Sequence, residues 1–182
     1  MSDSGKNILL GISGSIAAVK APELVRLLLD KNYKVRCLLT SGATQFVSPL
    51  ALSTFTGEKA VSELFGEEAY QLPHLKWASE ADIFVVAPAS ATVLARCAFG
   101  LAEDMVSLSY LNVASPVLMA PAMHNTMWEH PATQASVKIL KERGVSFVGP
   151  YQGPLADQTR GEGRMEEPHE IVKAVETLLK KR

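Results

Sequence analysis

The sequence is poor in cysteine, in aromatic side chains and in net charge of either sign. Its 182 residues include two cysteines, and 18 lysines and arginines oppose 19 acidic residues to leave a net charge of −1. Because Cys37 and Cys97 lie in apolar local patterns and two cysteines make no disulfide framework, we expect a reducing, cytoplasmic location. A net charge near zero produces no long-range attraction toward polyanions, so we expect neither a nucleic acid nor a membrane as partner.

Several common site motifs are also missing. No apolar run reaches the ~18 residues of a transmembrane helix, and Gly11 and Gly14 interrupt the run at 8–19 where a signal peptide would be continuous. The four histidines and two cysteines have neither His-x-x-x-His nor Cys-x-x-Cys spacing, so we expect no metal site. A Gly-x-Ser-x-Gly elbow is absent too, which leaves nucleophilic catalysis without a candidate.

What the sequence does contain is an alternation of short apolar runs and amphipathic segments. We expect strands at 7–12, 34–39, 81–87, 117–120 and 145–148, and helices at 16–31, 43–47, 91–98, 103–111, 133–143 and 168–179. This alternation predicts a single α/β domain over residues 1–182, with three α/β/α layers, a parallel sheet and a Rossmann-like rather than flavodoxin-like strand order. In such a fold the binding crevice lies at the carboxyl ends of the strands, so we expect function in the loops that follow them.

The first of these loops has the composition of a phosphate site. It joins the first strand to the first helix, and its candidate binding residues are Ser13, Gly14, Ser15 and Ile16. Hydroxyls and backbone N–H groups at the positive end of a helix suit a phosphate, although the spacing is neither the dinucleotide fingerprint nor a P-loop. Thr40 and Ser41 form a similar polar turn after the second strand, which favours a mononucleotide; a tight turn without a ligand is the alternative.

Two further loops are candidates for the wall of a ligand pocket. The small residues Pro88, Ala89, Ser90 and Ala91 follow the third strand. They either let a flat aromatic ring approach the backbone or serve close packing of helix on sheet. The loop at 121–128 combines methionine, histidine, asparagine and tryptophan, which suits a pocket wall, with a small hydrophobic cluster as the alternative.

Two other features point less clearly to a role. The stretch at 149–167 is the longest one without a regular pattern, and a loop of that length is usually functional or disordered. His74 lies in a stretch of unclear structure, where it is either a structural histidine or a general acid or base.

The order of these segments resembles that of the homo-oligomeric flavin-containing cysteine decarboxylases. The resemblance runs from residue 11 to about residue 168. It rests on Gly-Ile-Ser-Gly-Ser-Ile-Ala-Ala at 11–18, the segment from His74 to Ala81-Asp82, Ala-Pro-Ala-Ser-Ala at 87–91, Pro-Ala-Met-x-x-x-Met-Trp at 121–128 and Gly-x-Gly-Arg-Met-x-Glu-Pro at 161–168. The last segment is most similar to the branch that converts 4′-phosphopantothenoyl-cysteine to 4′-phosphopantetheine in coenzyme A biosynthesis.

This resemblance implies an FMN cofactor and a role for each segment. FMN would be bound by residues 13–16, by Thr40 and Ser41 at its phosphate, and by residues 88–91 near its ring. In this family the flavin oxidises the cysteine thiol to a thioaldehyde, carbon dioxide leaves, and the reduced flavin returns the electrons to the enethiolate. His74 corresponds to the family histidine and would take the proton as the thiol is oxidised.

The resemblance also implies how the substrate is bound. The loop at 121–128 would receive the substrate carboxylate through either His124 or Asn125. Residues 149–168 would cover the substrate as a flap that excludes water. The implied substrate-binding residues are His124, Asn125, Met127, Gly163, Arg164 and Met165.

Three residues depart from the family pattern. The family often has asparagine in place of Thr92 and of His124, and many members have a proton-donating cysteine in place of Asp157. Asp157 is therefore expected as a catalytic residue, but a carboxyl group donates a proton near pH 7 only if burial raises its pKa. Two alternatives stay open, namely a lantibiotic-type peptidyl-cysteine oxidative decarboxylase that stops at the enethiol and a non-catalytic flavin-binding regulatory subunit.

The resemblance finally implies partners. One small domain shields a flat flavin ring poorly, so we expect a homotrimer or homododecamer in which a neighbouring subunit completes the pocket. A phosphopantothenate–cysteine ligase is expected as well, either as a further domain of a longer chain or as a separate polypeptide.

Overall fold

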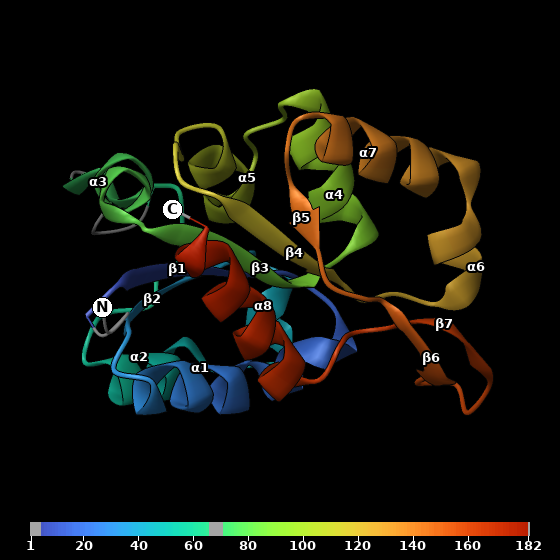
Figure 1. Ribbon diagram of the computed structural model, residues 1–182, viewed down its shortest axis with the longest axis horizontal. Helices are drawn as coiled ribbons and strands as arrows, with labels where there is room; N and C mark the ends of the chain where they lie inside the picture. Colours follow the sequence, from blue (N-terminus) through green and yellow to red (C-terminus); the bar gives the residue numbers. More distant parts are fainter. Residues whose placement is uncertain (1–4, 66–70, 182) are drawn as a thin grey trace.

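The computed structural model describes residues 5–65 and 71–181, which form a parallel sheet between two layers of helices (Figure 1). The strands are β1 (Asn7–Ile12), β2 (Lys34–Leu39), β3 (Ile83–Ala89), β4 (Val117–Pro121) and β5 (Ser146–Phe147). One face of the sheet is covered by the 3-10 helix η1 (Ile16–Lys20) and by α1 (Ala21–Asp30), α2 (Pro49–Thr56) and α8 (Pro168–Lys180). The other face is covered by α3 (Pro73–Glu80), α4 (Ala91–Phe99), α5 (Met105–Tyr110) and α7 (Pro131–Glu142). The expected three-layer α/β/α class is confirmed.

The strand order is Rossmann-like once a short bridge at the sheet edge is counted. The five strands run β2-β1-β3-β4-β5, all parallel. Beyond β2, Val61 forms an isolated parallel bridge with Leu38, and its backbone N–H donates to the carbonyl of Cys37 over 3.0 Å. Val61 lies between β2 and β3 in the sequence. If it is counted as the third strand, then β3, β4 and β5 become the fourth, fifth and sixth, and the order across the sheet is 3-2-1-4-5-6, which is the Rossmann order. Without it, the five strands alone would match the flavodoxin order.

The sheet is buried on both faces, as its apolar strands require. All seven residues of β3 are buried, and Phe84 is among the largest side chains that are fully removed from solvent. Leu24 and Leu28 of α1 pack on one face and Leu94 of α4 on the other, and each buried side chain of this size contributes about 1.5–3 kcal/mol through the hydrophobic effect. Within the described residues, no helix is long and apolar enough to cross a lipid bilayer.

Several element boundaries differ from the sequence-based expectation. The helix expected at 16–31 is two elements, because Pro22 lies in the first turn of α1 and lacks the N–H that a continuous helix would use. The short helix expected at 43–47 is the 3-10 turn η2 (Ala43–Gln45). Three helices were not expected: α2, α3 and the short helix at Asn125–Glu129. Both α2 and α3 have a proline at their start, a position where proline is favoured rather than disruptive.

The stretch at 149–167 is regular, contrary to expectation. It contains an antiparallel hairpin of β6 (Tyr151–Pro154) and β7 (Arg160–Arg164), which extends beyond the carboxyl ends of the parallel strands (Figure 1). Beside it lies the short helix α6 (Asn125–Glu129), which follows β4.

Glycines allow β7 to lie directly against the chain that follows β4. The backbone N–H of Met123 donates to the carbonyl of Gly163 over 2.9 Å. A Cβ atom at Gly163 would be 2.3 Å from the Met123 carbonyl oxygen, and one at Gly161 would be 2.7 Å from Cβ of Asn125. Neither position has room for a side chain, so both glycines are required by close packing.

We predict that Gly163→Ala releases the hairpin from the body of the protein. The added methyl group must push β7 away from Met123, which breaks the backbone hydrogen bond and costs about 1–3 kcal/mol. Hydrogen exchange should then show faster exchange of the β6 and β7 amides, with unchanged protection in β1 and β3. Glu162→Ala, which changes an exposed side chain on the same strand, is the matched control. Equal hairpin protection in Gly163→Ala and the control would contradict this account.

Candidate functional site

A cavity of about 620 Å³ opens at the carboxyl ends of the strands, where the sequence predicts function. Its volume is in the range of ligand pockets. Five segments line it: the first turn with η1, Phe46 after η2, the start of α4 after β3, the loop after β4 with α6, and the hairpin with Met165. Of the residues expected at the site, the cavity is lined by Gly14, Ser15, Ile16, Ser90, Ala91, His124, Met127, Asp157, Gly163, Arg164 and Met165.

Ser13 holds two of these segments together from behind the cavity. Its side chain is fully buried, and its hydroxyl donates to the Pro88 carbonyl over 2.7 Å. The same oxygen accepts the backbone N–H of Ser90 over 2.8 Å. Ser13, Pro88 and the buried Ala89 are not lining residues, so their part in the site is to fix the position of Ser90 and the start of α4.

The two polar turns expected to receive a phosphate lie against each other. A Cβ atom at Gly14 would be 3.0 Å from the backbone of Gly42, so the first turn and the turn after β2 meet at a distance that leaves a side chain very little room. Thr40 is buried, and its hydroxyl oxygen accepts the N–H of Ala43, whereas Ser41 is exposed. Neither lines the cavity, but both belong to the turn that borders it.

The residues present fit a flavin on these observations. Small side chains at Ser90, Ala91 and Ala122 leave space for a flat ring at the cavity wall, and Thr92, which departs from the family pattern, also lines it. The paired turns at Gly14 and Gly42 bring hydroxyls and backbone amides together, and groups of this kind at the start of a helix suit a phosphate.

The loop after β4 presents His124, and not Asn125, to the cavity. His124 caps the start of α6, where its Nδ1 accepts the Thr126 N–H over 3.3 Å and lies 2.8 Å from the Thr126 hydroxyl oxygen. Asn125 lies under Gly161 of the hairpin and is not a lining residue. Of the two carboxylate-binding candidates that the sequence left open, the geometry favours His124.

Asp157 stands at the turn of the hairpin and is paired with His124. Its Oδ2 is 3.1 Å from His124 Nε2, and its Oδ1 accepts the hydroxyl of Thr159 over 2.7 Å and the Thr159 N–H over 3.1 Å. Hydrogen bonds from Thr159, and then from His124, lower the pKa of the Asp157 carboxyl. The side chain is exposed, so the burial that would raise its pKa and make it a neutral proton donor is missing. Asp157 therefore does not meet the condition that the sequence analysis set for a carboxyl proton donor, which is a pKa raised by burial.

A cluster of charged residues that the sequence did not reveal joins the hairpin to η1. Glu167 accepts hydrogen bonds from Lys20 Nζ (2.7 Å), the Tyr151 hydroxyl (2.9 Å) and Arg164 (3.1 Å), and we call these four residues the Glu167 cluster. The Lys20 ammonium is the main cause of a lowered pKa at Glu167. Lys20 and Arg164 also line the cavity, so the cluster holds two cations at its wall. The signal in the sequence was weak, since Lys20 and Glu167 are 147 positions apart.

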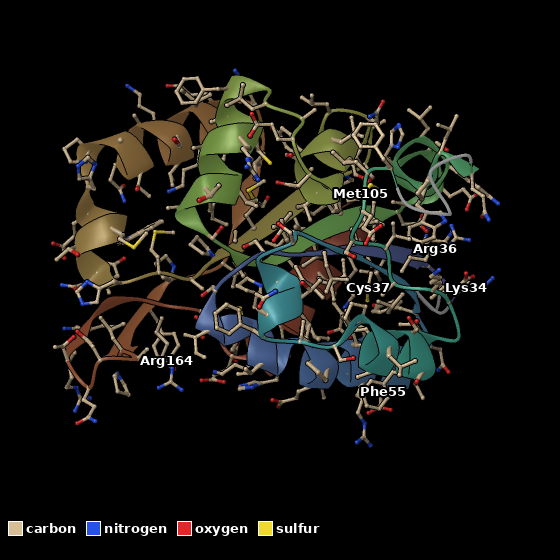
Figure 2. The ribbon with its side chains drawn as sticks, turned by 180° about the vertical axis from the view of Figure 1, so that it is seen from behind. Lys34, Arg36, Cys37, Phe55, Met105 and Arg164 are labelled. Atoms are coloured by element: carbon tan, nitrogen blue, oxygen red, sulfur yellow. The ribbon has the colours of Figure 1, made fainter. Side chains whose placement is uncertain are left out.

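His74 is the one expected catalytic residue that the chain keeps away from this cavity. It lies on α3, is half-buried and is not a lining residue. The same helix carries Trp77, whose ring lies under the Arg36 guanidinium at 5.5 Å. Figure 2 shows Arg36 and Arg164 at opposite ends of the molecule, so α3 and the hairpin are far apart within one chain.

Other reactive groups offer no second catalytic centre in residues 5–65 and 71–181. Burial raises the pKa of both Cys37 and Cys97 to about 12, so neither is a nucleophile at neutral pH. In the same residues, no three His, Cys, Asp or Glu side chains are grouped as a metal site requires.

Comparison with known proteins agrees with this geometry. The family model "Flavoprotein" matches residues 1–180. The chain is 39% identical over 176 residues to the coenzyme A biosynthesis bifunctional protein CoaBC of Mycobacterium tuberculosis, covering 97% of this chain and 42% of that protein. The chain thus spans less than half the length of this curated relative.

Two solved structures have the same fold over nearly the whole chain. One is a cysteine-to-serine variant of PPC decarboxylase complexed with pantothenoylaminoethenethiol, with a TM-score of 0.86, 27% identity, and coverage of 95% of this chain and 97% of the other. The FMN-binding protein AtHal3 gives a TM-score of 0.85 at 27% identity, with coverage of 97% and 98%. These matches confirm the resemblance to the flavin-containing cysteine decarboxylases and support a flavin as the cofactor. The chain belongs to the Flavoprotein family.

Proposed function

We propose that this chain decarboxylates 4′-phosphopantothenoyl-cysteine to 4′-phosphopantetheine with bound FMN, as a cytoplasmic step of coenzyme A biosynthesis. The observation that carries the proposal is the cavity itself, where an apolar wall meets Lys20, His124 and Arg164 under a hairpin of the family's flap sequence. The similarity to CoaBC over 97% of this chain supports the same substrate.

Bound FMN supplies the reversible two-electron oxidation of the substrate thiol, and the chain's own residues bind and orient. Ser15 and the turn at Thr40 and Ser41 provide hydroxyls for the FMN phosphate. His124 receives the substrate carboxylate, while Lys20 and Arg164 attract the anionic ends of the substrate. The hairpin covers the substrate and excludes water, which strengthens each of these charge interactions.

A second copy of the chain completes the site in this proposal. Ile16, Val19 and Phe46 line the cavity, yet they are 54, 56 and 42% exposed. Exposed apolar side chains that gather at one place are typical of a ligand groove or of a surface that another protein covers, and a shared site would be both. A homotrimer or homododecamer would bury them and would bring His74 from a neighbouring copy to the cavity.

A ligase belongs to the same proposal. The relatives named CoaBC are bifunctional, and this chain matches 42% of the length of the one described above. The substrate is a cysteine amide, so an amide-forming ligase must supply it, either fused to this chain or as a separate polypeptide.

The second candidate is a peptidyl-cysteine oxidative decarboxylase that releases the enethiol. The observation in its favour is Asp157, since no flap cysteine is present to protonate the product. A flavin-binding regulatory subunit without activity is the third possibility. All three bind flavin, and the product distinguishes them.

We predict that the purified protein contains FMN and converts 4′-phosphopantothenoyl-cysteine to a product lighter by one carbon dioxide. Mass spectrometry of the product and release of the bound flavin test this directly. A product that is lighter by two further hydrogens would indicate the enethiol-forming enzyme, and flavin without any product would indicate the regulatory subunit.

We also predict that His74→Asn retains FMN and loses about 100-fold or more in turnover, because a general base contributes at least that factor. His169→Asn, a change at an exposed histidine of α8, is the matched control. Full activity in His74→Asn would exclude the assigned role.

Co-expression tests whether His74 acts across subunits. His74→Asn is combined with Ala91→Trp, which fills the cavity of its own chain but keeps His74. Mixed oligomers should regain activity that neither variant has alone. Inactive mixed oligomers would contradict a site shared between copies.

A further inference from the structure

The single hydrogen-bond donor of the His124 ring already has a partner within the chain. Nδ1 accepts the backbone N–H of Thr126 over 3.3 Å, and the Thr126 hydroxyl, 2.8 Å away, is placed to donate to the same nitrogen. A neutral imidazole has one N–H group, which therefore lies on Nε2. This N–H donates to Oδ2 of Asp157 over 3.1 Å, and both side chains line the cavity. His124 thus binds a carboxylate of its own chain at the wall of the cavity.

Asp157 carries the same chemical group as the substrate cysteine, a carboxylate. Its Oδ1 accepts the Thr159 hydroxyl over 2.7 Å and the Thr159 N–H over 3.1 Å, which leaves Oδ2 for His124. The hydrogen bonds from Thr159, and then from His124, lower the pKa of the Asp157 carboxyl, so it is ionised at neutral pH. Among the described residues that line the cavity, Asp157 is the one acidic side chain.

We propose that Asp157 competes with the substrate for His124, because its carboxylate holds the Nε2–H group that the carboxylate of the substrate cysteine needs. This inference rests on the proposed function, in which His124 receives that carboxylate. One N–H group cannot serve two carboxylates at hydrogen-bond distance, and two negative charges so close to each other repel. The substrate must therefore displace Asp157 from His124, which makes the contact between the two side chains autoinhibitory.

Other polar groups near the cavity do not take over this task from His124. Lys20 and Arg164 donate to Glu167, over 2.7 and 3.1 Å, at the base of the hairpin, whereas Asp157 lies in the turn at the other end of the hairpin. Asn125 is packed under Gly161 and is not a lining residue. Binding of the substrate carboxylate therefore depends on the donor that Asp157 holds.

Asp157 can leave His124 while the strands of the hairpin keep their position. The Asp157 side chain is 49% exposed, so water can replace His124 at Oδ2. Its bonds to Thr159 lie within the turn and move with it. The strands are held separately, since the Gly163 carbonyl accepts the Met123 N–H over 2.9 Å. We therefore expect only the turn to change when the substrate carboxylate replaces Asp157.

Two ligands that cannot react separate the carboxylate from the rest of the substrate. 4′-Phosphopantothenoyl-alanine keeps the carboxylate but has no thiol to oxidise, and 4′-phosphopantothenoyl-ethylamine is the same molecule without the carboxylate. The Kd of each is measured by isothermal titration calorimetry with the purified protein that contains its FMN.

Asp157→Ala should bind the alanine compound about fivefold more tightly than the wild type does, because a hydrogen bond between exposed side chains changes an equilibrium by about that factor. Its Kd for the ethylamine compound should be unchanged. Asp157→Asn keeps an acceptor oxygen but loses the charge, so its Kd for the alanine compound should lie between those of the wild type and Asp157→Ala.

Glu162→Ala is the matched control for the loss of charge. It removes one negative charge from an exposed position of β7 that does not line the cavity. Both Kd values should be the same in this variant as in the wild type.

A double variant tests whether the competition acts through His124. His124→Ala should bind the alanine compound more weakly than the wild type does. Addition of Asp157→Ala to it should change that Kd by less than about twofold, since no N–H group is left to compete for. Hydrogen exchange of the β1 and β3 amides shows whether these variants keep the fold.

The outcomes separate this inference from the proposed function. If neither ligand binds to the wild type, the proposed function fails and the inference fails with it. If both bind and Asp157→Ala binds the alanine compound no more tightly, the function stands and the inference is overturned. Equal tightening of both ligands also overturns it, because the effect then does not concern the carboxylate, as does a fivefold effect that persists without His124.

Discussion

The buried hydroxyl of Ser13 is the contact on which the site depends. It joins the loops that follow β1 and β3, two strands that are neighbours in the sheet although their connections lead to opposite faces. At this point of divergence the helices separate and leave a crevice, as in other open α/β sheets. The hydroxyl adds to a backbone hydrogen bond from the Ser13 N–H to the Pro88 carbonyl over 3.2 Å, and it fixes Ser90, at the start of α4, relative to the first turn.

The hairpin adds to this scaffold through two kinds of contact. Backbone packing at Gly161 and Gly163 fixes it against the loop after β4, and the Glu167 cluster fixes its base to η1. The first contact leaves no space for a side chain, and the second brings charge to the cavity wall. The hairpin is therefore fixed at the edge of the cavity, and its turn brings Asp157 to His124.

Local patterns in the sequence were sufficient to predict the strands that position the loops of the site. β1 and β2 have the expected bounds, because short apolar runs bounded by polar residues are typical of buried parallel strands. The hairpin was missed because its buried positions Gly153, Gly161 and Gly163 carry no apolar side chain, so the alternation of a strand is invisible. Gly163 packs against Met123 and Gly161 packs against Asn125, and these contacts are visible only in the folded structure.

The residues of the site also fall into two groups, those that the sequence predicts and those that only the structure shows. Loop positions such as Ser15 and Ala91 follow from the rule that strand ends bind ligands, and the structure places both at the cavity. The pairing of Lys20 with Glu167, the position of His74 on a distant helix, and the contact of His124 with Asp157 depend on tertiary structure, since no local pattern encodes a distance across the fold.

The contact between His124 and Asp157 also has a consequence for how such a site can change over generations. The two side chains are partners although they lie 33 positions apart in the sequence. A change at either position leaves the other side chain without its partner, so we expect the two positions to change together.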